Sequence, residues 1–265
     1  DGFTNNKVVI QGVLGDIRPI SEWRSVTVNS ENEVTAIDWS RCELNGSLAL
    51  QWLPETVENL CLHYDSLHGT LDCSMLPASS THLSLESNAL DGSLDLDALP
   101  GKLIDLSLSE NRFSGEISLK KLPDALKSLY LCDNDLSGSV DLDNLPQRLQ
   151  DLHLQRNSFS GTVSLTQLPQ TLCTLSLEGN RFSGPLDLTG LPPRMKQIVL
   201  SSNEFEGATD FSKLPRSLVV LCIANLKISG DLTGVKLNMH EDWYDYPEAG
   251  VFVDGENTPN VLGRN

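Results

Sequence analysis

The sequence has no long hydrophobic run, and its longest strongly apolar stretch reads LVVLCI, residues 218–223. A helix needs about 20 apolar residues to cross a bilayer, so we expect no transmembrane segment. Basic residues are also scarce, with 19 Lys and Arg against 36 Asp and Glu and a formal net charge of −17. This charge excludes nucleic acid and anionic membrane surfaces as partners and favours a protein or peptide of basic character.

A 23-residue period organises most of the chain. An Asn followed four residues later by Gly recurs at Asn88, Asn111, Asn134, Asn157, Asn180 and Asn203. The glycine series extends from Gly46 to Gly230, and the Asn position of the outer repeats holds Cys42, Asp65 and Leu226. We predict three parts: an N-terminal cap over residues 1–33, nine repeats over 34–234, and an acidic and aromatic tail over 235–265 that docks on the last repeats.

Each fixed letter of the repeat has a physical reason. Leu152 and Leu154 alternate with polar neighbours, which predicts a short strand with its leucines inward. The amide of Asn157 can bond backbone groups that would otherwise be buried unpaired. Two residues later, one apolar residue per repeat predicts a continuous apolar spine. A second alternation, as in Val140 and Leu142, ends at a Leu-Pro pair and predicts a second short strand.

These features resemble leucine-rich repeats, whose signature is LxxLxLxxN at a period of 20 to 29 residues. FSGPLDL resembles plant-type repeats, LPQRLQDLHLQRN resembles the LP-type repeats of bacterial effectors, and the combination is similar to repeat proteins of protists. WRSVTVNSENEVTAIDW resembles the plant-type cap motif, with Ser25 at its Gly place and Val28 at its Cys place, so the family's cap disulfide cannot form there.

The resemblance implies an α/β-type leucine-rich repeat solenoid that is mostly strand and coil, with little helix. Its coils should form a curved right-handed superhelix. A parallel sheet of about nine strands should line the concave face, and a sheet of short strands should form a second side.

The six cysteines occupy unrelated places in the repeats. A disulfide needs Cα atoms within about 7 Å, which between coils requires nearly the same slot in neighbouring repeats, and no pair meets this condition. Six unpaired thiols are unusual in secreted proteins. We therefore favour a reducing intracellular or organellar compartment over a secreted or cell-surface one.

Function is expected in the freely varying residues that face outward from the strands. Neighbouring strands lie about 4.8 Å apart, so His82 should lie beside Asp105 and Tyr130 beside His153. Tyr and Arg are common interface anchors. We predict a partner-binding patch composed of His82, Asp105, Tyr130, Asp151, His153, Gln155 and Arg156.

Two other surfaces follow from the repeat register. One slot beside the second strand holds Asp72, Asp95, Asp141, Asp187 and Asp210, which we interpret as a solvated acidic stripe. In the last repeats, Val199 and Val220 occupy outward slots that are polar elsewhere. We therefore expect a covering segment there, with the aromatic tail as the nearest candidate.

An enzymatic function has little support. Cys132 and His153 lie on adjacent predicted strands but roughly 8 Å apart along the backbone, beyond the reach of a nucleophile and its base. A zinc site from His82, Asp105 and His153 would span three coil spacings and lacks a ligand-spacing signature. Nothing resembles a nucleotide-binding loop. We expect no enzyme, no cofactor and no metal.

Three functions stay open. We favour a non-catalytic protein–protein interaction module or scaffold subunit of a larger hetero-complex, which binds its partner through the repeat surface. The alternative is a ligand-sensing ectodomain of a plant-type leucine-rich repeat receptor or surface protein. The third is a catalytic protein whose active part lies outside this chain.

Overall fold

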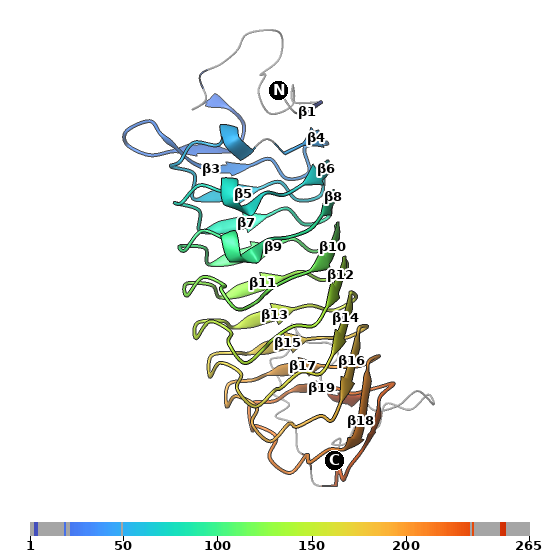
Figure 1. Cartoon of the computed structure of the whole chain (residues 1–265). Coiled ribbons are helices and arrows are strands. Elements are labelled where there is room, and N and C mark those ends of the chain that lie inside the picture. Colours follow the sequence, from blue (N-terminus) through green and yellow to red (C-terminus); the bar gives the residue numbers. More distant parts are fainter. Residues whose placement is uncertain are drawn as a thin grey trace.

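The alternation of leucine with polar residues produces the predicted strands, and each 23-residue repeat makes one coil. The computed structural model describes residues 3–4, 19, 22–48, 50–233, 235 and 250–252. The coils stack along one axis, and each contributes a strand to each of two sheets (Figure 1). Helix is limited to 3-10 turns in the described residues: η2 (Leu50–Trp52), η3 (Cys73–Met75) and η4 (Leu96–Ala98). The predicted leucine-rich repeat solenoid is confirmed.

The first sheet carries the strand face on which the binding patch was predicted. Its eleven strands are β2 (Val26–Val28), β3 (Val34–Asp38), β5 (Asn59–Cys61), β7 (His82–Ser84), β9 (Asp105–Ser107), β11 (Ser128–Tyr130), β13 (Asp151–His153), β15 (Thr174–Ser176), β17 (Gln197–Val199), β19 (Val220–Cys222) and β21 (Gly250–Phe252). The nine strands from β3 to β19 are parallel and in register, so that Leu129 pairs with Leu106 on one side and Leu152 on the other. One strand per repeat is the predicted number.

The second sheet lies beside the first along the whole stack. Its ten strands are β1 (Phe3–Thr4), β4 (Asn45–Ser47), β6 (Ser66–Thr70), β8 (Ala89–Gly92), β10 (Arg112–Glu116), β12 (Asp135–Gly138), β14 (Ser158–Gly161), β16 (Arg181–Gly184), β18 (Glu204–Ala208) and β20 (Lys227–Ser229). The second strand of each repeat lies earlier in the sequence than predicted. Val140 and Leu142 were expected to form it, but β12 ends at Gly138. Gly138 ends β12 with φ 81°, and a Cβ there would lie 2.6 Å from Cγ of Glu116. The glycine of this slot therefore permits a left-handed turn.

Val140 and Leu142 are buried but lie in an irregular segment, just before a turn at Asp143, rather than in a strand. The reason is the aspartate between them, since Oδ1 of Asp141 accepts the backbone N–H of Asp143 at 3.0 Å. A side chain thus takes the donor that a strand would offer to its neighbour. The same bond recurs in the acidic stripe, where Asp72 and Asp95 cap η3 and η4. The stripe therefore has a structural role that the sequence interpretation missed.

The coils are held together by the predicted ladder of asparagines. Nδ2 of Asn157 donates to the carbonyl of Leu131 in the preceding coil at 2.9 Å and to that of Leu154 in its own coil at 3.2 Å. Oδ1 of Asn157 accepts the N–H of Leu136 at 3.0 Å. The same pattern occurs at the other five ladder asparagines. Beside the ladder, the predicted spine is fully buried from Leu44 to Phe205.

The two ends of the array differ from its middle. At the N-terminal end β2 pairs with β3 and β1 pairs with β4, both antiparallel, and Nε1 of Trp39 donates to the carbonyl of Arg24 at 2.9 Å. Ser25 has φ 53°, which explains why the resembling cap motif has glycine at this place. At the C-terminal end β21 runs parallel to β19, and Val199 and Val220 are 8% and 3% exposed. Most of the cap and tail lies outside the described residues, so the expected boundaries and tail docking stay predictions.

Candidate functional site

The first predicted contact of the patch joins β7 to β9. Because Leu83 and Leu106 point into the core, the residues that alternate with them face outward. Nε2 of His82 lies 2.9 Å from Oδ2 of Asp105, and both side chains stay more than a third exposed. On its other side, Nδ1 of His82 lies 2.9 Å from the hydroxyl of Thr81. Both ring nitrogens are thus fixed while one ring edge faces solvent.

The second predicted contact joins β11 to β13. The rings of Tyr130 and His153 stack with centroids 4.8 Å apart and planes inclined by 28°. Burial lowers the pKa of His153, against the opposing effects of the Asp151 charge and a hydrogen bond with Gln155. The imidazole is therefore neutral at pH 7 and forms a flat aromatic platform with Tyr130.

A ridge of left-handed residues borders this face where each strand ends. The residue before the ladder slot has φ between 53° and 64° in all nine repeats: Arg41, Tyr64, Ser87, Glu110, Asp133, Arg156, Gly179, Ser202 and Asn225. We call this set the strand-end ridge. Only one of the nine is glycine, although left-handed backbone is unfavourable for other residues. The side chains must therefore recover part of that cost.

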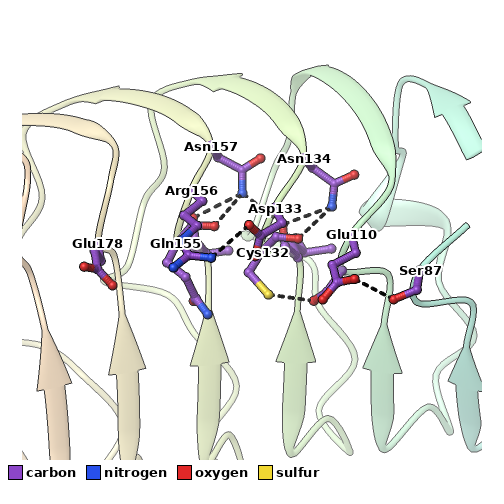
Figure 2. A network of polar contacts seen from close by, with 12 residues as sticks. Ser87, Glu110, Cys132, Asp133, Asn134, Gln155, Arg156, Asn157 and Glu178 are labelled. Carbon is purple, nitrogen blue, oxygen red and sulfur yellow. Dashed lines mark hydrogen bonds and ion pairs between the residues drawn. The ribbon is translucent and has the colours of Figure 1, made fainter. Parts of the chain in front are cut away.

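Side chains along the strand-end ridge bond their neighbours in the next coil. The guanidinium of Arg41 lies 4.3 Å from the ring centre of Tyr64, and Nη1 of Arg156 lies 3.4 Å from Oδ1 of Asp133. The hydroxyl of Ser87 donates to Glu110 at 2.7 Å. Figure 2 shows Ser87, Glu110, Asp133 and Arg156 lined up along the ends of adjacent strands, beside the ladder asparagines.

The predicted site residues therefore divide into two groups. His82, Asp105, Tyr130, Asp151 and His153 lie in adjacent strands of one face, as predicted from register. Gln155 and Arg156 lie beyond the end of β13, where Arg156 belongs to the strand-end ridge and Gln155 precedes it.

Sequence reasoning missed three acidic members of this region, Glu86, Glu110 and Asp133. Glu86 accepts a hydrogen bond from Ser107 at 3.2 Å. Glu110 and Asp133 belong to the strand-end ridge, bonded to Ser87 and Arg156. The sequence did carry a signal for them. Glu86 lies two residues before a ladder asparagine, and Glu110 and Asp133 each lie one residue before one.

The thiol nearest the patch is not activated. Sγ of Cys132 donates to the hydroxyl of Ser109 at 3.0 Å, and burial is the main cause that raises the pKa of this thiol. A nucleophilic cysteine needs the opposite shift. Within the described ranges, no three His, Cys, Asp or Glu side chains gather as metal ligands would, and no helix is both long and apolar enough to span a membrane.

Two of the solved structures that resemble the chain carry the comparison. One is the leucine-rich repeat ectodomain of the plant membrane receptor kinase GASSHO1/SCHENGEN3 from Arabidopsis thaliana, in complex with Casparian strip integrity factor 2. It has TM-score 0.56 and 28% identity over 67% of this chain and 22% of that chain. The other is a plant ice-binding protein with TM-score 0.62 and 24% identity over 79% of this chain and 71% of that chain, which shows the fold alone. No protein-family model and no curated protein matches the sequence.

The ectodomain comparison contradicts the expected compartment. We expected a reducing intracellular environment from six unpaired thiols, and all six are indeed free of disulfides. The similar ectodomain belongs to a membrane receptor and is extracellular, so the expectation was wrong. The expectation failed because burial keeps a thiol unreactive in any compartment. Burial raises the pKa of Cys42, Cys61 and Cys73, which disfavours the reactive thiolate.

The chain spans only about a fifth, 22%, of the receptor ectodomain that it resembles. The similarity to LP-type and protist repeats stays a prediction. The strand register, the asparagine ladder and the structural neighbours together assign the described repeats to the leucine-rich repeat fold.

Proposed function

We propose that this protein is a non-catalytic interaction module that binds a protein or peptide segment across the first sheet between β7 and β13. The observation that carries the proposal is the Tyr130–His153 stack beside the His82–Asp105 pair. Aromatic rings supply contact area with little entropy to lose, because their neighbours already fix them. The parallel strands below keep these groups at fixed spacing.

Two carboxylates beside the predicted patch support a basic partner. The carboxylates of Glu86 and Glu110 accept hydrogen bonds from serine hydroxyls, and no salt bridge reaches them among the described residues. An approaching Lys or Arg side chain would therefore gain an ion pair without breaking one. Net charge of −17 adds long-range attraction for such a partner.

Between the two finer interpretations, we propose a ligand-binding surface or secreted protein rather than a scaffold subunit. The 28% identity to a receptor ectodomain supports this choice, and that ectodomain was solved with a bound partner. A scaffold subunit would use the same strand face. The two differ in whether the partner is a soluble ligand or a constitutive neighbour.

Selection from a random peptide library tests the proposal without knowledge of the natural partner. We expect the wild-type protein to enrich peptides with Lys or Arg, and the variant Tyr130→Ala with His153→Ala to lose that enrichment. The matched control is Asp95→Asn with Asp141→Asn, which removes two charges from the acidic stripe, outside the predicted patch, but keeps the turn-capping acceptors. Equal enrichment by all three proteins would refute the proposal.

A further inference from the structure

The ladder slot of the second repeat holds an acid instead of an amide. Oδ1 of Asp65 replaces the asparagine oxygen as a hydrogen-bond acceptor. It accepts the backbone N–H groups of Leu44 at 2.9 Å and Cys42 at 3.0 Å. In six later repeats the second polar atom of this slot is an NH2 group that donates to backbone carbonyls, as Asn88 does toward Leu62 at 2.8 Å. A carboxylate has no proton to donate there.

The second oxygen of Asp65 is accordingly left over. Oδ2 is buried and has no hydrogen-bond partner within the described structure. An unpaired buried anion is far more costly than a neutral acid, because water is excluded and, in the asparagine repeats, this atom of the slot faces backbone carbonyls, as Nδ2 of Asn88 does. A protonated Oδ2 could donate to those carbonyls and restore the pattern of the asparagine repeats.

The charged and titratable groups around Asp65 come from its own turn and from the preceding coil. His63 precedes it in the turn, and Nδ1 of His63 is also buried without a partner. Cys42 of the preceding coil lies beside Asp65, to which its backbone N–H donates. Burial raises the pKa of the Cys42 thiol, the charge of Arg24 lowers it, and the charges of Asp65 and Asp38 raise it further. Burial raises the pKa of Asp65, against the backbone N–H groups and the charge of His63, which lower it. Burial therefore outweighs the groups that favour the anion.

We propose that Asp65 is a proton-operated latch between the first two coils. When protonated, its Oδ2–H donates to backbone carbonyl oxygens in place of the ladder amide and joins the coils. When Asp65 loses this proton to solvent, the bond is lost and the N-terminal coil loosens. Tyr64 and Arg41, which stack on each other across the same two coils, are loosened with it.

The direction of the pH dependence follows from the raised pKa of Asp65 in the folded state. The latch contributes its full stability below the ordinary aspartate pKa of 3.8, and this contribution is lost as pH rises through the folded-state pKa. The equilibrium constant for opening rises about tenfold for each unit between the two values. The first coil should therefore be held more tightly in acid than at neutral pH.

The test compares wild type, Asp65→Asn and Asn88→Asp between pH 4 and 8. We expect Asp65→Asn to raise the urea midpoint at pH 7 and to remove the loss of stability with rising pH. Asn88→Asp should add a second such loss one coil further on. Hydrogen exchange of the Cys42 and Leu44 amides, corrected for intrinsic rates, should be slower in Asp65→Asn than in the wild type at pH 7.

Two results would overturn the latch. One is an Asp65→Asn variant with the wild-type pH profile. The other is a carboxyl carbon resonance of Asp65 that titrates at or below 3.8 in the wild-type protein, a readout that holds even where Asn88→Asp fails to fold. A stabilised Asp65→Asn variant with unchanged peptide binding would confirm the latch independently of the proposed function.

Discussion

Replacement of Asn157 by alanine removes one rung of the ladder and tests how the coils are joined. Four hydrogen bonds are lost: Nδ2 donates to the carbonyls of Leu131, Leu154 and Gln155 at 2.9, 3.2 and 3.3 Å, and Oδ1 accepts from Leu136 at 3.0 Å. Bond number alone overstates the effect, because some of these backbone groups keep another partner.

The leucine carbonyls are shared between rungs. Nδ2 of Asn134 still donates to Leu131, and Nδ2 of Asn180 still donates to Leu154. The N–H of Leu136, in a fully buried residue, loses its side-chain acceptor. One buried donor without a partner costs about 1–3 kcal/mol, so we predict a loss of about 2 kcal/mol in the free energy of unfolding.

Asn203 provides a graded comparison. Leu226 fills the next ladder slot, and in the described chain the carbonyl of Leu200 accepts from no ladder amide other than Asn203. Asn203→Ala therefore removes the side-chain partner of this carbonyl and that of the N–H of Phe182. We predict a loss of about 3 kcal/mol in the free energy of unfolding. Urea unfolding at pH 7, followed by circular dichroism, gives both values. An unchanged midpoint for Asn157→Ala would refute the ladder argument.

Two further predictions concern backbone strain and thiol chemistry. Gly179→Ala should lower the free energy of unfolding by about 1 kcal/mol in the same urea assay. The added Cβ would lie 3.5 Å from Cγ of Arg156, an ordinary contact, so the cost comes from φ 64°; an equal cost for Gly179→Ala and Gly179→Asn would count against this reasoning. Cys73 should resist iodoacetamide at pH 8 in the folded protein, because burial raises its pKa to about 12. Rapid alkylation of Cys73, detected by peptide mass spectrometry, would contradict its burial.

Much of the fold could be predicted because the repeat fixes both spacing and direction. Leu152 identifies a strand, Asn157 the rung and Phe159 the spine, and all three lie where the sequence places them. Leu154 is buried as predicted but lies one residue beyond the end of β13. The second strand was misplaced because alternating burial also arises in an irregular segment, where Asp141 takes the N–H of Asp143. Periodicity reports which side chains are buried, while strand pairing also depends on free backbone groups.

The candidate site could be predicted only where strand register decides it. His82 meets Asp105 because paired strands bring equal slots together. The Arg156–Asp133 pair was not foreseen, since it depends on the left-handed backbone of the strand-end ridge. Residues as different as Tyr64 and Glu110 share that conformation. Closure of each coil therefore imposes it, and the residue type at this position does not predict it.

Titration of a selected basic peptide tests the binding claim most directly. We predict that Tyr130→Ala with His153→Ala weakens binding at least about tenfold while the urea midpoint stays unchanged. The control, Asp95→Asn with Asp141→Asn, should bind as the wild type does, after correction for the change in net charge. Loss of binding in the control, with full binding in the Tyr130→Ala and His153→Ala variant, would place the partner on the acidic stripe and contradict the account.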